Sequence, residues 1–143
     1  RWGWIENQAG VLIRELLRLT KPEGFMAIGN LGIQAKCKVL ISLGQHALET
    51  RAPALAERIT DVAKAIQKFD DFRNDVIHGL WVHAPGGTSN LALLQRKSLQ
   101  QKVDPMADAE IMARLDAKLT ELHELQNTAQ TITKDLKKLL RGK

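Results

Sequence analysis

Apolar residues near the C-terminal end recur every three or four positions, and this spacing constrains the fold more than any other feature of the sequence. They are Leu122, Leu125, Ala129, Ile132, Leu136 and Leu139. The spacing places one apolar stripe along a long α-helix, which other helices must cover. We expect this helix to begin at Asp104 and Pro105, because aspartate caps helices and proline suits the first turn.

Three earlier segments show the same helical spacing. The first covers residues 5–17 and ends before a break predicted at residues 21–24, which include Pro22 and Gly24. The second covers residues 26–50 and is apolar on most sides, which predicts a central helix whose glycines let its neighbours approach closely. The third begins at Pro53 and carries an apolar stripe as far as Phe69.

The chain changes character between the third and the last long helix. Residues 81–83 and 91–94 flank a turn-rich segment, residues 84–90, which predicts a short β-hairpin or an ordered loop. The whole sequence contains no Tyr and only three Phe and three Trp, a composition that favours helices over strands. We therefore expect an all-α fold with one domain over residues 1–143, a four- to five-helix up-and-down bundle with this hairpin or loop inserted.

The net charge of +5 is concentrated at the C-terminal end, where the last ten residues contribute +4 of it. The basic residues there are Lys134, Lys137, Lys138, Arg141 and Lys143. Cations are favourable at the C-terminus of a helix, so we interpret this segment as structural rather than as a phosphate-binding patch.

Several classes of protein are disfavoured by what the sequence lacks. No run approaches the roughly 18 to 20 apolar residues that cross a bilayer, so we expect a cytoplasmic protein without a membrane partner. The sequence begins with Arg1 rather than Met, so we expect a trimmed start. The single cysteine, Cys37, excludes an internal disulfide and a multi-thiolate metal site, and its apolar neighbours predict a buried thiol.

The densest polar cluster is residues 69–81, Phe-Asp-Asp-Phe-Arg-Asn-Asp-Val-Ile-His-Gly-Leu-Trp. Four residues beyond Phe69 the apolar stripe of the third helix reaches Arg73, a position that the pattern reserves for a buried side chain. A guanidinium removed from water needs a carboxylate or an anionic ligand beside it. Either Asp75 or an acid on another helix supplies the carboxylate, or a phosphate group takes its place.

His78 follows Arg73 by five residues, which is roughly 140° around an α-helix. The two positions therefore do not share one face of a helix. They act on one phosphate only if the helix is distorted near His78, or if two subunits each contribute a helix across a two-fold axis. The pair therefore predicts a homodimer.

Arg73, the polar Asn74, His78 and Gly79, in a small helical chain, resemble the ribonuclease motif of the HEPN superfamily (higher eukaryotes and prokaryotes nucleotide-binding domains). Beyond the motif the resemblance extends only to the number, order and length of the helices. It implies an up-and-down bundle that dimerises so that two Arg/His motifs face one cleft. It also implies metal-independent RNA cleavage of the toxin or phage-defence type, with an antitoxin protein as a possible partner.

Under this resemblance Arg73 and His78 are catalytic, Asn74 and Asp75 bind or orient the substrate, and no metal or cofactor takes part. An imidazole with a pKa of about 6.5 can take the proton of the ribose 2′-hydroxyl or protonate the leaving oxygen. A guanidinium can stabilise the charge of the transition-state phosphate. The product would be a 2′,3′-cyclic phosphate, and DNA would not be cut.

Three other interpretations stay open. His78 before a glycine is also typical of a residue that caps the C-terminus of a helix. Asp71, Asp75 and His78 share one helix face, so they form a candidate carboxylate and histidine metal site. The chain is also compatible with a non-catalytic helical module of the same fold that binds RNA or a protein partner.

Overall fold

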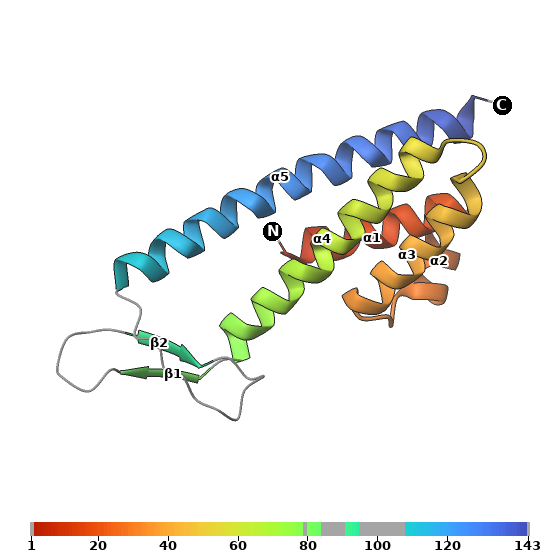
Figure 1. The fold of residues 1–143 in the computed structure, drawn as a ribbon. Helices are drawn as coiled ribbons and strands as arrows, with labels where there is room; N and C mark the ends of the chain where they lie inside the picture. Colours follow the sequence, from red (N-terminus) through yellow and green to blue (C-terminus); the bar gives the residue numbers. More distant parts are fainter. Residues whose placement is uncertain (1, 79, 84–90, 95–107, 143) are drawn as a thin grey trace. The chain divides into compact units, whose positions relative to one another are not determined.

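The computed structural model describes residues 2–78, 80–83, 91–94 and 108–142, with side chains for residues 2–74 and 112–142. The described residues form five helices: α1 (Trp2–Leu17), α2 (Lys21–Ile28), α3 (Ile33–Leu48), α4 (Pro53–His78) and α5 (Asp108–Arg141). Figure 1 shows the two longest, α4 and α5. The predicted all-α class is therefore correct.

Two short strands lie between α4 and α5, β1 (Leu80–His83) and β2 (Leu91–Leu94). They pair antiparallel, with Leu80 opposite Leu94 and His83 opposite Leu91. The turn expected at residues 84–90 lies outside the described residues, so the hairpin stays a prediction.

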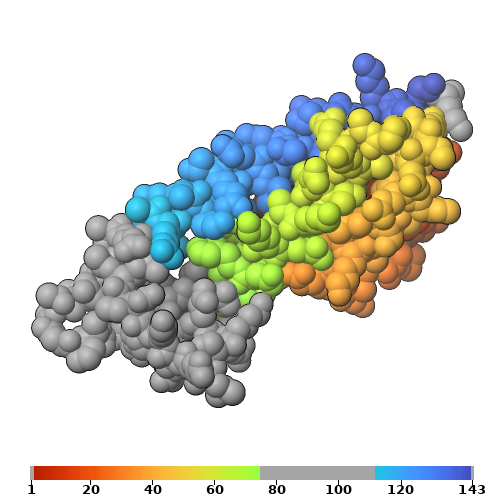
Figure 2. All heavy atoms as spheres, viewed as in Figure 1, coloured from red at the N-terminus to blue at the C-terminus, as the bar shows by residue number. Residues whose placement is uncertain are grey.

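The chain forms two compact units, residues 1–68 with 124–143, and residues 69–123. In the first unit α1 packs against α2 and α3. The beginning of α4 lies beside the end of α5 (Figure 2). There Arg58 Nη1 is 2.8 Å from Asp135 Oδ2. The largest fully buried side chains all belong to this unit: Ile5, Leu12, Ile13, Cys37, Leu40, Leu48, Ile59, Ile66, Ile132 and Leu136.

Residues 21–24 begin a helix, α2, so the break predicted there is wrong. Thr20 has the extended backbone of an N-cap, with φ −66° and ψ 165°. The Glu23 carboxylate accepts hydrogen bonds from the Thr20 backbone N–H at 2.8 Å and from its hydroxyl at 2.6 Å. Pro22 lies in the first turn, where a helix needs no N–H from it. The proline therefore starts a helix here instead of ending one.

The helix predicted over residues 26–50 is in fact two helices. The chain leaves α2 after Ile28, and Gly32 is the N-cap of α3. Gly29 and Gly32 thus lie at helix ends rather than in a helix interior. Gly44 alone among the three glycines fits the predicted close approach, because a Cβ placed on it would lie 3.0 Å from Ile59 Cγ2.

The start of the third predicted helix and the state of the cysteine are confirmed. Helix α4 begins at Pro53, and its apolar stripe is buried as far as Phe69. Cys37 is fully buried, as predicted. The predicted start of the last helix at Asp104 and Pro105 lies outside the described residues, and the described part of that helix begins at Asp108.

Candidate functional site

The buried face of α4 includes a charged residue. Phe69 continues the apolar stripe and is 7% exposed, and the next residue, Asp70, is buried although it carries a carboxylate. A carboxylate removed from water is unfavourable unless hydrogen bonds or a cation compensate it. We therefore expect polar side chains close to the Asp70 carboxylate.

Two residues of the predicted motif contact Asp70. Asn74 Nδ2 donates to Asp70 Oδ2 at 3.4 Å, and Arg73 Nη1 lies 3.9 Å from Asp70 Oδ1. Arg73 Nη1 also donates to Asn74 Oδ1 at 3.3 Å. The side chains of Asp70, Arg73 and Asn74 thus contact one another along one helix, and we call them the Asp70 cluster. The structure thus brings together two of the four predicted site residues, Arg73 and Asn74.

Arg73 is less buried than the apolar pattern predicts. Its side chain is 37% exposed, whereas that of Asp70 is 5% exposed. At this level the buried face of α4 passes through Phe69 and Asp70, so Arg73 lies at the edge of that face. Part of the Arg73 side chain is therefore open to solvent, whereas the Asp70 side chain is buried.

The other two predicted site residues lie near the end of the same helix. Asp75 and His78 belong to α4, and His78 is its last residue. The side chains of both lie outside the described residues, so their predicted roles stay predictions. The same holds for the candidate metal site of Asp71, Asp75 and His78. Among the side chains that the structure describes, no group of three or more His, Cys, Asp or Glu could hold a metal ion.

An aromatic pair lies on α4 next to the Asp70 cluster. The rings of Phe69 and Phe72 meet edge to face, with 6.0 Å between their centroids. Lys118 of α5 holds its Nζ 5.4 Å from the centre of the Phe72 ring and also donates to the Glu121 carboxylate. A cation at this distance from a ring is attracted by its electrons. Phe72 and Lys118 thus contribute to the packing of the second unit.

Asp70 is the site residue that sequence analysis missed. The large apolar residues of α4 form the stripe that the pattern detects. A second buried column runs beside it through Ala56, Ala63 and Asp70, at intervals of seven residues. Two alanines give little signal in a hydropathy pattern, so their continuation to Asp70 is easily overlooked. The seven-residue interval was the signal that could have placed Asp70 on the buried side.

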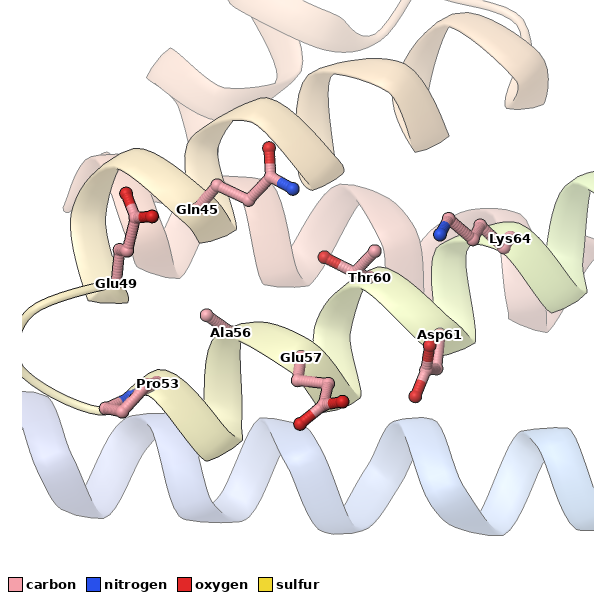
Figure 3. A pocket seen from close by; sticks show the side chains of 8 residues that line it. All are labelled: Gln45, Glu49, Pro53, Ala56, Glu57, Thr60, Asp61 and Lys64. Carbon is pink, nitrogen blue, oxygen red and sulfur yellow. The ribbon is translucent and has the colours of Figure 1, made fainter.

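A hollow of about 290 Å³ opens in the first unit (Figure 3). Its lining residues are Gln45, Glu49, Pro53, Ala56, Glu57, Thr60, Asp61 and Lys64. Figure 3 shows Gln45 and Glu49 on the side of α3, with Thr60 facing them from α4. None of the predicted site residues lines this hollow.

The basic C-terminal segment forms the end of α5. Lys138 and Arg141 lie in its last turn, where the unpaired backbone carbonyl groups make cations favourable. Lys137 Nζ lies 3.8 Å from Glu15 Oε1, and Arg51 Nη2 donates to the Leu139 carbonyl oxygen at 3.4 Å. These contacts agree with a structural role for the segment. Lys143 lies outside the described residues.

No protein-family model matches the chain, and no curated protein and no solved structure matches it significantly. The resemblance to the HEPN superfamily therefore depends on the motif residues and stays a prediction. Among the described residues, no helix is long and apolar enough to cross a membrane.

Proposed function

We propose that this chain is a metal-independent endoribonuclease of the toxin or defence type, with Arg73 and His78 as its catalytic residues. The setting of the Arg73 side chain carries the proposal. The Arg73 side chain is partly exposed, is held by a hydrogen bond to Asn74, and lies on the helix that ends at His78. A guanidinium held in this way is suited to bind a phosphate group that approaches from solvent.

The proposed enzyme is a homodimer. Helix α4 continues to His78, so the positions of Arg73 and His78 lie roughly 140° apart around one helix. A second copy, related by a two-fold axis, would bring its own α4 to the same phosphate. In this proposal the helices form an up-and-down bundle with a hairpin before α5, as the HEPN resemblance implies. The dimer would be cytoplasmic, with an antitoxin protein as a possible partner.

The proposed chemistry needs only side chains of this motif. His78 would take the proton from the ribose 2′-hydroxyl or give one to the leaving oxygen. Arg73 would stabilise the additional negative charge of the phosphate in the transition state. Asn74 and Asp75 would bind or orient the substrate. The 2′-oxygen attacks the phosphorus, the bond to the 5′-oxygen breaks, and the products are a 2′,3′-cyclic phosphate and a 5′-hydroxyl.

A second candidate function is a non-catalytic helical module that binds RNA or a protein partner. The observation that favours it is the 3.9 Å contact between Arg73 and Asp70 within one copy. This carboxylate offsets part of the positive charge that a phosphate group needs. The charge on Arg73 would then serve packing or binding rather than transition-state stabilisation.

The deciding experiment compares RNA cleavage by the wild type, His78→Ala and His46→Ala. His46 is an exposed histidine of α3, so its substitution controls for the loss of an imidazole. We expect the wild type to cut RNA in the presence of EDTA, to leave 2′,3′-cyclic phosphate ends and to spare DNA of the same sequence. His78→Ala should lower the rate by roughly 10² to 10⁴, the usual contribution of a general acid or base.

Two outcomes would contradict the proposed function. RNA that stays intact with the wild-type dimer, with and without divalent metal, would favour the non-catalytic module. Cleavage that requires a divalent metal would favour the site of Asp71, Asp75 and His78. The oligomeric state, measured by light scattering, adds an independent check, because a strict monomer could not form the shared site.

A further inference from the structure

Asp70 is a buried carboxylate to which the proposed reaction gives no role. Its side chain is 5% exposed, yet it touches both polar side chains of the motif that the structure describes. A charge in this environment is costly to bury and is retained only where its contacts compensate the loss of water. The contacts of Asp70 should therefore explain why a carboxylate is buried at this position.

Helix geometry explains why Asp70 reaches both residues at once. Arg73 and Asn74 follow Asp70 by three and four residues, and residues at these two spacings lie next to each other on a helix surface. Arg73 and Asn74 are consecutive, so their side chains leave α4 about 100° apart. They contact each other only because both side chains turn toward the space between them. Asp70 lies where both can converge.

The distances show how the Asp70 cluster holds the guanidinium. The bonds from Asn74 to Asp70 and from Arg73 to Asn74 measure 3.4 and 3.3 Å, whereas Arg73 and Asp70 are 3.9 Å apart. The last distance is longer than a hydrogen bond and lacks the bidentate geometry of a close Arg–carboxylate pair. The Asn74 amide is thus the hydrogen-bonded link between the carboxylate and the guanidinium.

We infer that Asp70 is a positioning residue that fixes the guanidinium of Arg73 through the side-chain amide of Asn74. Asp70 anchors the Asn74 NH₂ group, and this leaves the Asn74 oxygen directed at Arg73 Nη1. The carboxylate stays buried, so it orients the guanidinium without meeting the RNA itself. The catalytic meaning of this arrangement rests on the proposed function, but the arrangement itself does not.

The first test measures the order of the Arg73 side chain directly. In the ¹⁵N-labelled full chain, the heteronuclear NOE of Arg73 Nε reports how rigidly the guanidinium is held. We expect an ordered signal in the wild type, well above that of the exposed Arg18, that falls clearly in both Asp70→Asn and Asn74→Ala. Asp61→Asn makes the same charge change at an exposed position of α4 and should leave the Arg73 signal as in the wild type.

The second test measures RNA cleavage by the same variants. Asp70→Asn should lower kcat by roughly 10- to 100-fold, because a misplaced catalytic group costs about this much, and should change KM little, because the charge of Arg73 remains. A wild-type chain that cuts no RNA would refute the proposed function, and the Arg73 signal would still decide the role of Asp70. An Arg73 signal that is mobile in the wild type, or equally ordered in Asp70→Asn and Asn74→Ala, would overturn the inference. So would full kcat in Asp70→Asn.

Discussion

Gly44 of α3 lies directly against Ile59 of α4, with only 3.0 Å between the place of a Cβ on Gly44 and Ile59 Cγ2. Ile59 is fully buried, so it has little room to move away. The contact joins α3 to α4, the helix that carries the motif. Gly44 is therefore a position where the absence of a side chain matters for packing.

Gly44→Val should destabilise the protein by about 1–3 kcal/mol, because extra carbon atoms must displace a packed isoleucine. The matched control is Gly10→Ala in the interior of α1, where the new Cβ would lie 3.7 Å from Ile28 Cδ1, an ordinary contact. This control should stabilise the protein by roughly 0.5–1 kcal/mol, because alanine favours the helix more than glycine does. Urea unfolding followed by circular dichroism measures both. A Gly44→Val protein as stable as the wild type would show that α3 and α4 do not approach this closely.

The sequence predicted those helices whose signals agree with one another. Pro53 and the large apolar residues after it predict the same helix start, and α4 begins there. Prediction from sequence failed at proline and glycine, because each of these residue types occurs both where helices start and where they end. The pattern predicts a break at Pro22, which lies in the first turn of α2, and a helix interior at Gly32, which is the N-cap of α3. The pairing of Thr20 with Glu23 three residues later, a pattern typical of a helix start, distinguishes Pro22 from a proline that ends a helix.

The sequence likewise predicts part of the candidate site and misses the rest. Arg73 and Asn74 stand out in the sequence because polar side chains interrupt an apolar stripe. Asp70 is harder to single out, because Asp71 beside it carries the same side chain and only the seven-residue interval from Ala56 and Ala63 distinguishes the two. The contact between Asp70 and Asn74 likewise depends on side-chain positions that no spacing rule supplies.

The end of α1 contains a backbone conformation that its residue does not favour. Arg18 has φ of 55°, in the left-handed region, and two hydrogen bonds close the helix around it: Arg18 N–H to the Glu15 oxygen at 3.1 Å and Leu19 N–H to the Arg14 oxygen at 3.0 Å. Helices commonly end in this way on glycine. Arg18→Gly should therefore raise the free energy of unfolding by about 1 kcal/mol.

Arg18→Ala is the control for that prediction, because it removes the exposed Arg side chain but keeps the Cβ that disfavours this backbone. We expect it to leave the stability close to that of the wild type. Thermal and urea unfolding of the three proteins give the comparison. If glycine and alanine had the same effect, the gain would not come from the backbone conformation.

The Glu23 carboxyl in the first turn of α2 should have a pKa below the usual value of a glutamate. The hydrogen bonds from the Thr20 hydroxyl and then from its backbone N–H lower the pKa of Glu23, because both favour the charged carboxylate. A lowered pKa in the folded chain means that this contribution to stability is present above the pKa of the unfolded chain and is lost as pH falls through the folded value.

Thr20→Val keeps the shape of the threonine but removes the hydroxyl, the larger cause of the shift. The pKa of Glu23 should then rise towards its usual value, while the remaining bond from the backbone N–H keeps part of the shift. An NMR titration of the Glu23 carboxyl carbon measures both proteins. The same midpoint in the two proteins would contradict a role for the hydroxyl.

Mixing two inactive variants tests whether the proposed catalytic site is shared between copies. Because α4 runs to His78, the positions of Arg73 and His78 lie roughly 140° apart on one helix. We therefore propose that the shared cleft holds two symmetric sites, each of which pairs Arg73 of one copy with His78 of the other. A dimer of one Arg73→Ala copy and one His78→Ala copy then has one site that lacks both residues and one that is intact. Each variant alone should be inactive. After denaturation and refolding together, random pairing should restore about a quarter of the wild-type activity, because half of the dimers are mixed and each has one of two sites. A mixture that stays inactive, although mass spectrometry detects mixed dimers, would refute this crossed pairing of Arg73 and His78.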